Sequence, residues 1–348
     1  MKSSAIRVTA TLLISGTFAG AAADAFGVFK SEDRGRSWRR SDDGLPERSR
    51  INAFGSAKGI LFAGTDSGVF TSIDEALSWR PAKVASAAPG RVISFASLGR
   101  RVLAGTDGNG LCVSSDGGAS WTLDRAFPSP KVRSLCVHDG KVYAGTDAHG
   151  VFHSTDAGQS WTPLSTGLPR HAQVFALSAA RGELFAGLYS RGLYGWDPEK
   201  RSWHKTGSVT PLALVSIEDT LIAGHNPGGI SWSSDWGATW SKGMAEGSSA
   251  EFSISFPGVH SHALSNDAPV WELGSGGNLV FAGASAGIYY SQNQGRTWTL
   301  AQGGLPAGSP GIAFIVNEKF VLAGVLIKGS QSELKPPAQA TSADVRGE

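Results

Sequence analysis

The sequence predicts an all-β fold, a seven-bladed β-propeller, from two repeated patterns and from the way the two chain ends complement each other. The first pattern, Ser-x-Asp-x-Gly-x-x-Trp, recurs about every 40 residues. Four copies are intact, at 31–38, 114–121, 154–161 and 233–240, and weaker copies end at Trp79, Trp203 and Trp298. The second pattern is an apolar pair followed by Ala-Gly, with its glycine at positions 64, 105, 145, 187, 224, 283 and 324. Both patterns occur seven times.

Each repeat is long enough for four short antiparallel strands. In one unit, alternation and β-branched residues predict strands over 132–138, 142–146, 151–154 and 160–163. The Ser-x-Asp-x-Gly-x-x-Trp segment, called the box below, then forms the turn between the third and fourth strands. Its Ser and Asp side chains can bond backbone N–H groups of the turn, its Gly can adopt positive φ, and its Trp can cover the gap between units.

The chain ends predict a ring closed by one shared blade. Residues 27–29 supply a third strand and Trp38 lies in the fourth, whereas 312–316 and 320–324 supply the first and second strands. Such closure removes free sheet edges. We therefore expect a propeller over 26–328. An insertion is predicted at about 242–269, where the Trp spacing lengthens to 58 residues, and a disordered tail over 329–348.

The first residues have the features of a secretion signal. Lys2 and Arg7 precede an apolar run over 8–22, and two candidate cleavage sites follow it. The run is too short and too often interrupted to predict a membrane span. We expect a signal peptide over 1–25, cleaved after Ala23 or Ala25, no membrane span after its removal, and a periplasmic or secreted product.

Composition argues against a general nucleic-acid-binding surface. The 31 Lys and Arg residues face 29 Asp and Glu residues, and signal removal takes away two of the basic ones, so the mature chain is balanced. Cys112 and Cys136 occupy packing positions of the repeat, and an exported protein would permit them to pair. The sequence has no Cys-x-x-Cys spacing, which argues against redox chemistry. We expect no cofactor and no nucleic-acid partner.

The boxes, the Ala-Gly strands and the Gly-Leu-Pro loops at 44–46, 167–169 and 304–306 resemble the Asp-box (BNR-like) repeat superfamily. Within it, the chain is most similar to exported proteins that are photosystem II stability and assembly factor-like. The resemblance covers nearly all of the mature chain. It implies a non-enzymatic propeller that binds a membrane-protein subunit, in part through an arginine-rich patch. The same repeats occur in sialidases, xyloglucan-cleaving glycosidases and sortilin-type receptors, so a carbohydrate-active function stays open.

The box residues are expected to be structural, because a turn role explains every copy. They should lie on the face of the ring opposite the one that binds ligands. The residues concerned are Asp33, Trp38, Asp74, Trp79, Asp116, Trp121, Asp156, Trp161, Asp235, Trp240 and Trp298.

Binding residues are expected in the loops that join successive units. The segments 39–50, 80–91 and 122–133 hold ten basic residues against four acidic ones, which predicts a basic sector shared by three neighbouring blades. Arginine holds carboxylates through paired hydrogen bonds. The candidate binding residues are Arg48, Arg50, Arg91, Arg125 and Arg133. An ordinary solvated rim is the alternative interpretation.

The insertion adds Glu251, His260 and His262 as candidates on the same face. The two histidines could hold a metal, but spacing fixes no further ligand, so no metal site is expected. Scarce tyrosine argues against sialidase chemistry. A two-carboxylate glycosidase stays open through Asp66, Asp107 and Asp147 with Glu246 or Glu251, although those three aspartates share one repeat position, which favours turn-making.

The sequence therefore favours an exported, monomeric, non-catalytic binding module or assembly scaffold. Its expected partner is a protein, with a membrane-protein subunit as one candidate. The alternative is a carbohydrate-active propeller, either glycan-binding or a glycoside hydrolase.

Overall fold

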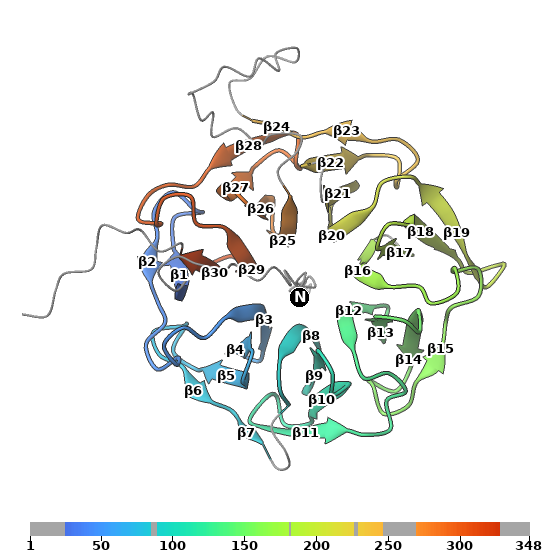
Figure 1. Cartoon of the computed structure of the whole chain (residues 1–348), viewed down its shortest axis with the longest axis horizontal. Helices are drawn as coiled ribbons and strands as arrows, with labels where there is room; N and C mark the ends of the chain where they lie inside the picture. Colours follow the sequence, from blue (N-terminus) through green and yellow to red (C-terminus); the bar gives the residue numbers. More distant parts are fainter. Residues whose placement is uncertain (1–24, 85–88, 181, 226–228, 246–268, 328–348) are drawn as a thin grey trace, which may run out of the picture.

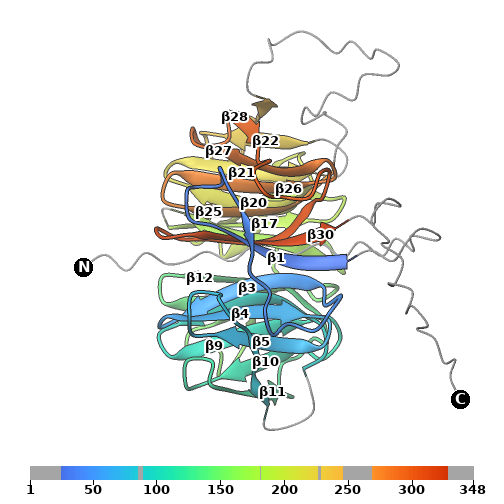
Figure 2. The ribbon, with the colours of Figure 1, turned by 90° about the vertical axis from the view of Figure 1, so that its left-hand side faces the viewer.

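Seven sheets of four or five strands are arranged in a ring about a central axis, as the computed structural model shows (Figures 1 and 2). The structure describes residues 25–84, 89–180, 182–225, 229–245 and 269–327. Within these ranges all regular structure is β, in thirty strands. This confirms the predicted seven-bladed β-propeller. Most of the expected signal peptide, the centre of the expected insertion and the expected tail lie outside the described residues.

The blades are numbered 1 to 7 along the chain, with blade 1 the one that both chain ends build. The first, or inner, strands of blades 1 to 7 are β29 (Gly311–Val316), β3 (Ile51–Ala57), β8 (Val92–Leu98), β12 (Val132–His138), β16 (Val174–Ala180), β20 (Pro211–Ile217) and β25 (Val270–Gly276). The second strands are β30 (Val321–Ile327), β4 (Ile60–Thr65), β9 (Arg101–Thr106), β13 (Lys141–Thr146), β17 (Glu183–Leu188), β21 (Thr220–His225) and β26 (Leu279–Ala284).

The third and fourth strands of each blade lie outside these two. The third strands are β1 (Ala25–Ser31), β5 (Gly68–Ser72), β10 (Leu111–Ser114), β14 (Val151–Ser154), β18 (Gly192–Asp197), β22 (Ile230–Ser233) and β27 (Gly287–Ser291). The fourth strands are β2 (Arg39–Arg40), β6 (Arg80–Pro81), β11 (Ser120–Asp124), β15 (Thr162–Pro163), β19 (Ser202–Gly207), β23 (Ser241–Lys242) and β28 (Thr297–Leu300). Blades 3 and 7 gain a fifth strand, because β7 (Lys83–Val84) and β24 (Met244–Ala245) pair in parallel with β11 and β28.

Blade 1 closes the ring as the sequence predicts. Its strand order is β2-β1-β30-β29, with Ala25 opposite Ile327 and Ser31 opposite Val321 across the antiparallel pair of β1 and β30. The N-terminal strand therefore joins the sheet that the C-terminal segment began. Because seven backbone positions of each end are paired in this way, the ring has no open seam.

The hydrophobic core lies between neighbouring blades. One cluster joins Phe62 of blade 2 to Phe95 and Trp121 of blade 3, and each of these side chains is fully buried. The rings of Phe62 and Trp121 meet edge to face with centroids 5.6 Å apart. Burial of such aromatic pairs contributes most of the favourable free energy of a propeller interface.

The box turns have the hydrogen bonds that the sequence predicts. In blade 3, the Ser114 hydroxyl donates to Asp116 at 2.7 Å, and the Gly118 N–H donates to the Ser114 oxygen at 2.7 Å. The Ser120 N–H and hydroxyl both donate to Asp116, at 3.0 and 2.6 Å. Such bonds favour the ionised carboxylate. In blade 1 the equivalent hydroxyl, from Ser37, leads the set that lowers the pKa of Asp33 to about 2.

Two blades carry altered boxes. In blade 7, Asn293 replaces the aspartate, and its amide group reproduces the hydrogen bonds to Ser291 and Thr297 without a charge. In blade 5, Asp197 caps a longer turn by accepting bonds from the N–H groups of Glu199 and Lys200. The turn geometry therefore depends on an oxygen acceptor and not on one fixed sequence.

Candidate binding site

The two faces of the ring differ in what they display. The box turns and the hairpins between first and second strands lie together on one face, which we call the box face. The Gly117 N–H of a box donates to the carbonyl of Arg100 in such a hairpin at 2.8 Å. The loops between blades and between second and third strands lie on the opposite face, which we call the loop face. Of the candidate binding residues from the sequence, Arg48, Arg50, Arg91 and Arg125 lie in loops of this second kind, and Arg133 is the second residue of β12.

Each inner strand carries a β-bulge at its second residue, near the loop face. The pairing with the second strand shifts register there in all seven blades. A bulge leaves its extra residue outside the ladder and re-aims the side chain. The bulge residues of blades 1 to 7 are Ile312, Asn52, Ile93, Arg133, Phe175, Leu212 and Trp271. The site on the loop face is built around this ring of side chains.

A chain of ion pairs crosses blades 2 to 4. Arg91 lies 3.1 Å from Asp66 and 4.0 Å from Asp107, and Lys131 lies 2.7 Å from Asp107. Arg133 pairs with Asp147. Together with Arg50, these side chains form what we call the polar arc. It holds four cations and three carboxylates, so it retains one excess positive charge.

Backbone bonds fix the arc. The N–H of Asp107 donates to the carbonyl of Arg91 at 2.9 Å, and the N–H of Asp147 donates to that of Lys131 at 3.3 Å. Each bond holds the turn after a second strand against the residue that leads into the inner strand. The threonine that ends the second strand closes the same turn, as Thr106 does by donating to Gly110 at 2.9 Å. The arc therefore rests on rigid strand ends.

Arg50 is the least satisfied cation of the arc. Its Nε is buried and has no hydrogen-bond partner among the described residues. Burial and the neighbouring charge of Arg91 lower the pKa of Arg50, and Asp66 opposes that effect. A guanidinium donates five hydrogen bonds when fully engaged. The Nε donor of Arg50 is therefore not used by the carboxylates of the arc.

An apolar patch adjoins the arc on blades 5 to 7. The guanidinium of Arg133 lies 4.1 Å from the ring centre of Phe175, and Phe175 stacks on Tyr189 at 4.9 Å. Leu212 and Trp271 complete the patch beside Phe175. Tyr189 is 47% exposed, whereas Arg133 is only 7% exposed. The loop face thus offers an exposed aromatic ring beside a cationic arc.

The structure brings some of the predicted residues together and not others. Arg50, Arg91 and Arg133 share the polar arc, whereas Arg48 is an exposed loop residue with φ of 61° and Arg125 is exposed on the turn after β11. Glu251, His260 and His262 lie outside the described residues. The arc also engages Arg91 and Arg133 with Asp66, Asp107 and Asp147, which the sequence alone did not pair with any cation.

The apolar patch was not predicted as a unit. The residues Phe175, Leu212 and Trp271 of the patch share one repeat position, the second residue of an inner strand. Aligning the repeats places them at the same position, whereas the alternation of apolar and polar residues does not distinguish this position from others in a strand. The cysteines, by contrast, occupy the expected packing positions, and both are free. Cys112 is buried, which raises the pKa of its thiol to about 12. No cluster of His, Cys, Asp and Glu suited to a metal occurs among the described residues.

Within the described ranges, no helix suited to crossing a bilayer is present. A search of curated protein sequences finds no significant match. Solved structures match in fold. A structure of YCF48 bound to a D1 peptide aligns with TM-score 0.58 and 18% identity over 82% of this chain and 96% of that one. The extracellular domain of BT4673 from B. thetaiotaomicron aligns with TM-score 0.61 and 13% identity over 81% of this chain.

An enzyme shares the fold as well. The GH74 enzyme of Niastella koreensis aligns with TM-score 0.51 and 15% identity over 79% of this chain. This chain spans 38% of the BT4673 structure and 43% of the GH74 enzyme. Identities this low show the fold alone. A family model, that of the DUF6242 β-propeller domain, matches residues 90–311, and this chain therefore belongs to the DUF6242 β-propeller family.

Proposed function

We propose that this protein is an exported, non-catalytic Asp-box propeller that acts as a binding module or assembly scaffold and holds a protein partner on its loop face. The observation that carries the proposal is Arg50. Its buried Nε has no hydrogen-bond partner among the described residues, and it lies in an arc with one excess positive charge. Unsatisfied buried donors are costly unless a ligand engages them.

The partner that fits this face carries a carboxylate next to an apolar side chain. The carboxylate would engage Arg50 and the exposed Arg48 as bidentate or paired acceptor. The apolar side chain would pack on Tyr189, which is the exposed member of the apolar patch. The similarity to YCF48, whose structure contains a bound peptide, supports a protein partner, and the similarity to an extracellular domain supports export.

The carboxylates of the loop face are less suited to glycoside hydrolysis. A glycosidase needs one carboxyl that is protonated and a second that is ionised. Asp66, Asp107 and Asp147 are each paired with Arg or Lys, so none of the three is a carboxyl that stands apart from the cations of the arc. These contacts support a positioning role for the aspartates, which hold the arginine side chains in place.

The test is to crosslink this protein to its partners in periplasmic and membrane extracts of its own organism. Mass spectrometry then identifies the captured protein. Charge reversal at Arg48 and Arg50 should reduce recovery of the specific partner about tenfold or more, because each lost charged hydrogen bond costs about 1.5–3 kcal/mol. Arg50→Gln tests the same contact without adding a buried negative charge.

The matched control is Arg36→Glu, which reverses an exposed arginine on the box face. It should leave capture unchanged. Capture of the partner at the wild-type level by the Arg48 and Arg50 charge-reversal variant and by Arg50→Gln would contradict the proposal. Turnover of a chromogenic glycoside, lost in Asp107→Asn or Glu251→Gln, would instead establish the carbohydrate-active alternative.

A further inference from the structure

A repeated contact joins neighbouring blades on the loop face. It involves the second residue after the glycine of each Ala-Gly pattern, which we call the turn residue. Its counterpart is the residue just before the inner strand of the next blade, which we call the lead residue. Three successive junctions pair a turn-residue carboxylate with a lead-residue donor: Asp66 with Arg91 at 3.1 Å, Asp107 with Lys131 at 2.7 Å, and Asp147 with Gln173 at 3.4 Å. Blades 2 to 5 are therefore linked by one type of contact.

The junction of blades 1 and 2 departs from this pattern. Its lead residue is Arg50, but its turn residue is Leu326, whose side chain has no acceptor atom. Leu326 nevertheless has the backbone position of a turn residue, because its N–H donates to the carbonyl of Pro310 at 3.0 Å. The equivalent bond of blade 3, from Asp107 to Arg91, measures 2.9 Å. Arg50 thus has a leucine at the position where the next two lead residues have a carboxylate.

Blades 1 and 2 pack against each other as their neighbours do. A Cβ on Gly324, in the second strand of blade 1, would lie 2.9 Å from Cβ of Ile51, which begins the inner strand of blade 2. A Cβ on Gly64 of blade 2 would lie 2.8 Å from Cγ1 of Val92, which begins the inner strand of blade 3. The junction therefore has the same close approach between blades and differs in the side chain of its turn residue.

The missing carboxylate accounts for the state of Arg50. The three carboxylates of the polar arc belong to the turns of blades 2, 3 and 4, so the excess positive charge of the arc lies at the junction of blades 1 and 2. Among the described residues, Arg50 takes part in no hydrogen bond or ion pair, and its Nε is buried. A buried charged donor without an acceptor is costly. A ligand that supplies the acceptor removes that cost.

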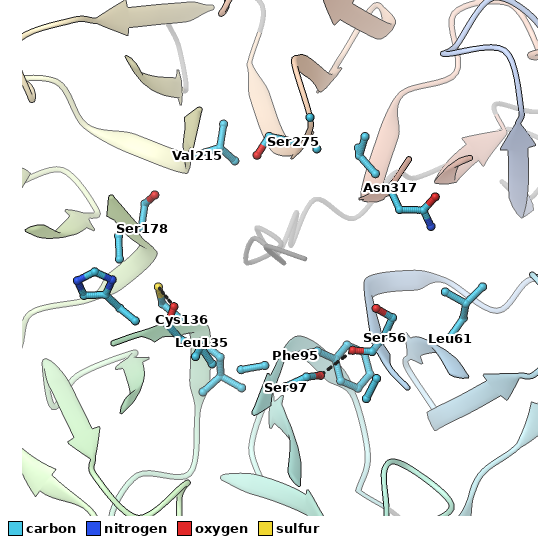
Figure 3. Close-up of a pocket in the computed structure, with 18 of the residues that line it drawn as sticks. Ser56, Leu61, Phe95, Ser97, Leu135, Cys136, Ser178, Val215, Ser275 and Asn317 are labelled. Carbon is cyan, nitrogen blue, oxygen red and sulfur yellow. Dashed lines mark hydrogen bonds between the residues drawn. The ribbon is translucent and has the colours of Figure 1, made fainter. Parts of the chain in front are cut away.

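A cavity of about 920 Å³ lies at the opposite end of the ring, among the hairpins between first and second strands. Figure 3 shows Ser56, Cys136 and Ser178 around it. Neither Arg50 nor Leu326 lines this cavity. The vacant carboxylate position at the junction of blades 1 and 2 is therefore separate from the cavity and belongs to the loop face.

We propose that the junction of blades 1 and 2 binds a side-chain carboxylate of the partner protein, in the place that turn-residue aspartates occupy at the next three junctions. This inference rests on the proposed function and adds to it the position of the contact and the residue that leaves it open. Arg50 donates to the carboxylate through two parallel N–H groups, the geometry in which guanidinium groups hold carboxylates. Leu326 keeps Arg50 available, because it supplies no acceptor that would compete with the partner.

Replacing Leu326 with Asp tests the proposal by filling the site from within. The new carboxylate should pair with Arg50 as Asp66 pairs with Arg91. Recovery of the crosslinked partner from periplasmic and membrane extracts should then fall about tenfold or more, although no cation has been removed. Leu326→Asn has nearly the same size without the charge, and it should recover at least about tenfold more partner than Leu326→Asp.

Ser285→Asp is the matched control. Ser285 is the turn residue of blade 7, and the lead residue of the next blade is Pro310, which offers no donor. The variant therefore adds the same charge at the same repeat position without a cation to neutralise. Recovery of the partner should stay at the wild-type level.

A second measurement tests the site without a partner. Urea midpoints are compared for the wild type, Leu326→Asp, Arg50→Gln and the double variant, which form a thermodynamic cycle. Leu326→Asp should lower the midpoint less when Arg50 is present than when Gln replaces it. The same cycle with Leu326→Asn should show a smaller difference, because the asparagine carries no charge.

A third measurement needs no variant and keeps the test decisive if Leu326→Asp does not fold. Extract proteins are treated with methylamine, with or without a carbodiimide that converts their carboxyl groups to amides. Wild-type protein should capture the partner from the extract treated with methylamine alone and should lose it from the amidated extract.

The proposal is overturned if folded Leu326→Asp captures the partner at the wild-type level, if Leu326→Asn or Ser285→Asp loses capture to the same extent, or if the amidated partner is captured undiminished. Absence of coupling between Leu326→Asp and Arg50→Gln also overturns it. Coupling without capture of any protein would instead contradict the proposed function while supporting the carboxylate site, so the two failures are distinguishable.

Discussion

Replacing Gly118 with Ala should destabilise the propeller more than the same change at its neighbour Gly117. Gly118 closes the box of blade 3, and its backbone has φ of 97°. A Cβ at this position would lie 2.1 Å from Cε1 and 2.3 Å from Cζ of Phe62 in blade 2. The glycine therefore allows the box turn to approach the core of the preceding blade. Phe62 is fully buried and cannot move without disturbing its contact with Trp121.

Gly117 is the matched control. It has φ of 83°, and a Cβ there would have no atom within 4 Å. Ala at either position must adopt a left-handed backbone conformation, which lowers the free energy of unfolding by about 1–2 kcal/mol. Only Gly118→Ala adds overpacking of the core, which costs about 1–3 kcal/mol. We therefore expect a loss of about 1–2 kcal/mol for Gly117→Ala and about 2–5 kcal/mol for Gly118→Ala.

Urea unfolding followed by tryptophan fluorescence measures both values. The double variant Phe62→Leu with Gly118→Ala should recover part of the loss, because a smaller side chain opposite the new methyl relieves the overlap, with a coupling of about 1 kcal/mol or more. Losses at Gly117 and Gly118 that agree within about 0.5 kcal/mol, or an absence of coupling to Phe62, would refute the role of this glycine in packing between blades.

Three further predictions follow from the charges and thiols. Hydrogen bonding lowers the pKa of box aspartates such as Asp33 to about 2, so their contribution to stability is present above pH about 4 and is lost as the pH falls toward 2. Asn293→Asp should therefore raise the urea midpoint at pH 7 and lose that gain at pH 2. An equal gain at both pH values would contradict the argument. Asp147→Ala, which leaves the buried Arg133 unpaired, should lower the free energy of unfolding by about 2–4 kcal/mol in thermal or urea unfolding. Asp66→Ala, at an exposed pair, should lower it by less than about 1 kcal/mol. Similar losses would show that burial of the guanidinium does not matter. A thiol reagent should titrate one cysteine in the native protein and both after denaturation, and two fast native thiols would place Cys112 at the surface.

The fold was predictable from the sequence because its turns depend on local chemistry. The box requires a side-chain acceptor, a residue with positive φ and a tryptophan at fixed offsets, and these requirements are satisfied within eight neighbouring residues. The predicted strands of blade 4 match those observed closely, with a shorter fourth strand at Thr162–Pro163. Ring closure was also predictable, because the missing half of a blade at one end is present at the other.

The candidate site was only partly predictable, since it depends on residues from different blades. The sequence placed arginines in the right loops, but it gave no sign that Arg91 bridges Asp66 and Asp107 or that Arg133 is buried against Phe175. These contacts join positions 16 to 42 residues apart in the chain. Their geometry is set by the angle between blades and by the bulge in each inner strand, and neither can be recognised from the sequence of a single repeat.

The sequence by itself determined the repeat, the strand order within each blade and the closure of the ring, because turn chemistry and strand alternation act over short distances. The tertiary structure decided which charges neutralise one another, which cation stays unsatisfied and where the channel opens. Those properties arise when seven similar units are placed side by side, because the ion pairs and the lining of the channel join residues of different blades. Packing between units, and not the pattern within one, therefore sets the arrangement of charges on the loop face.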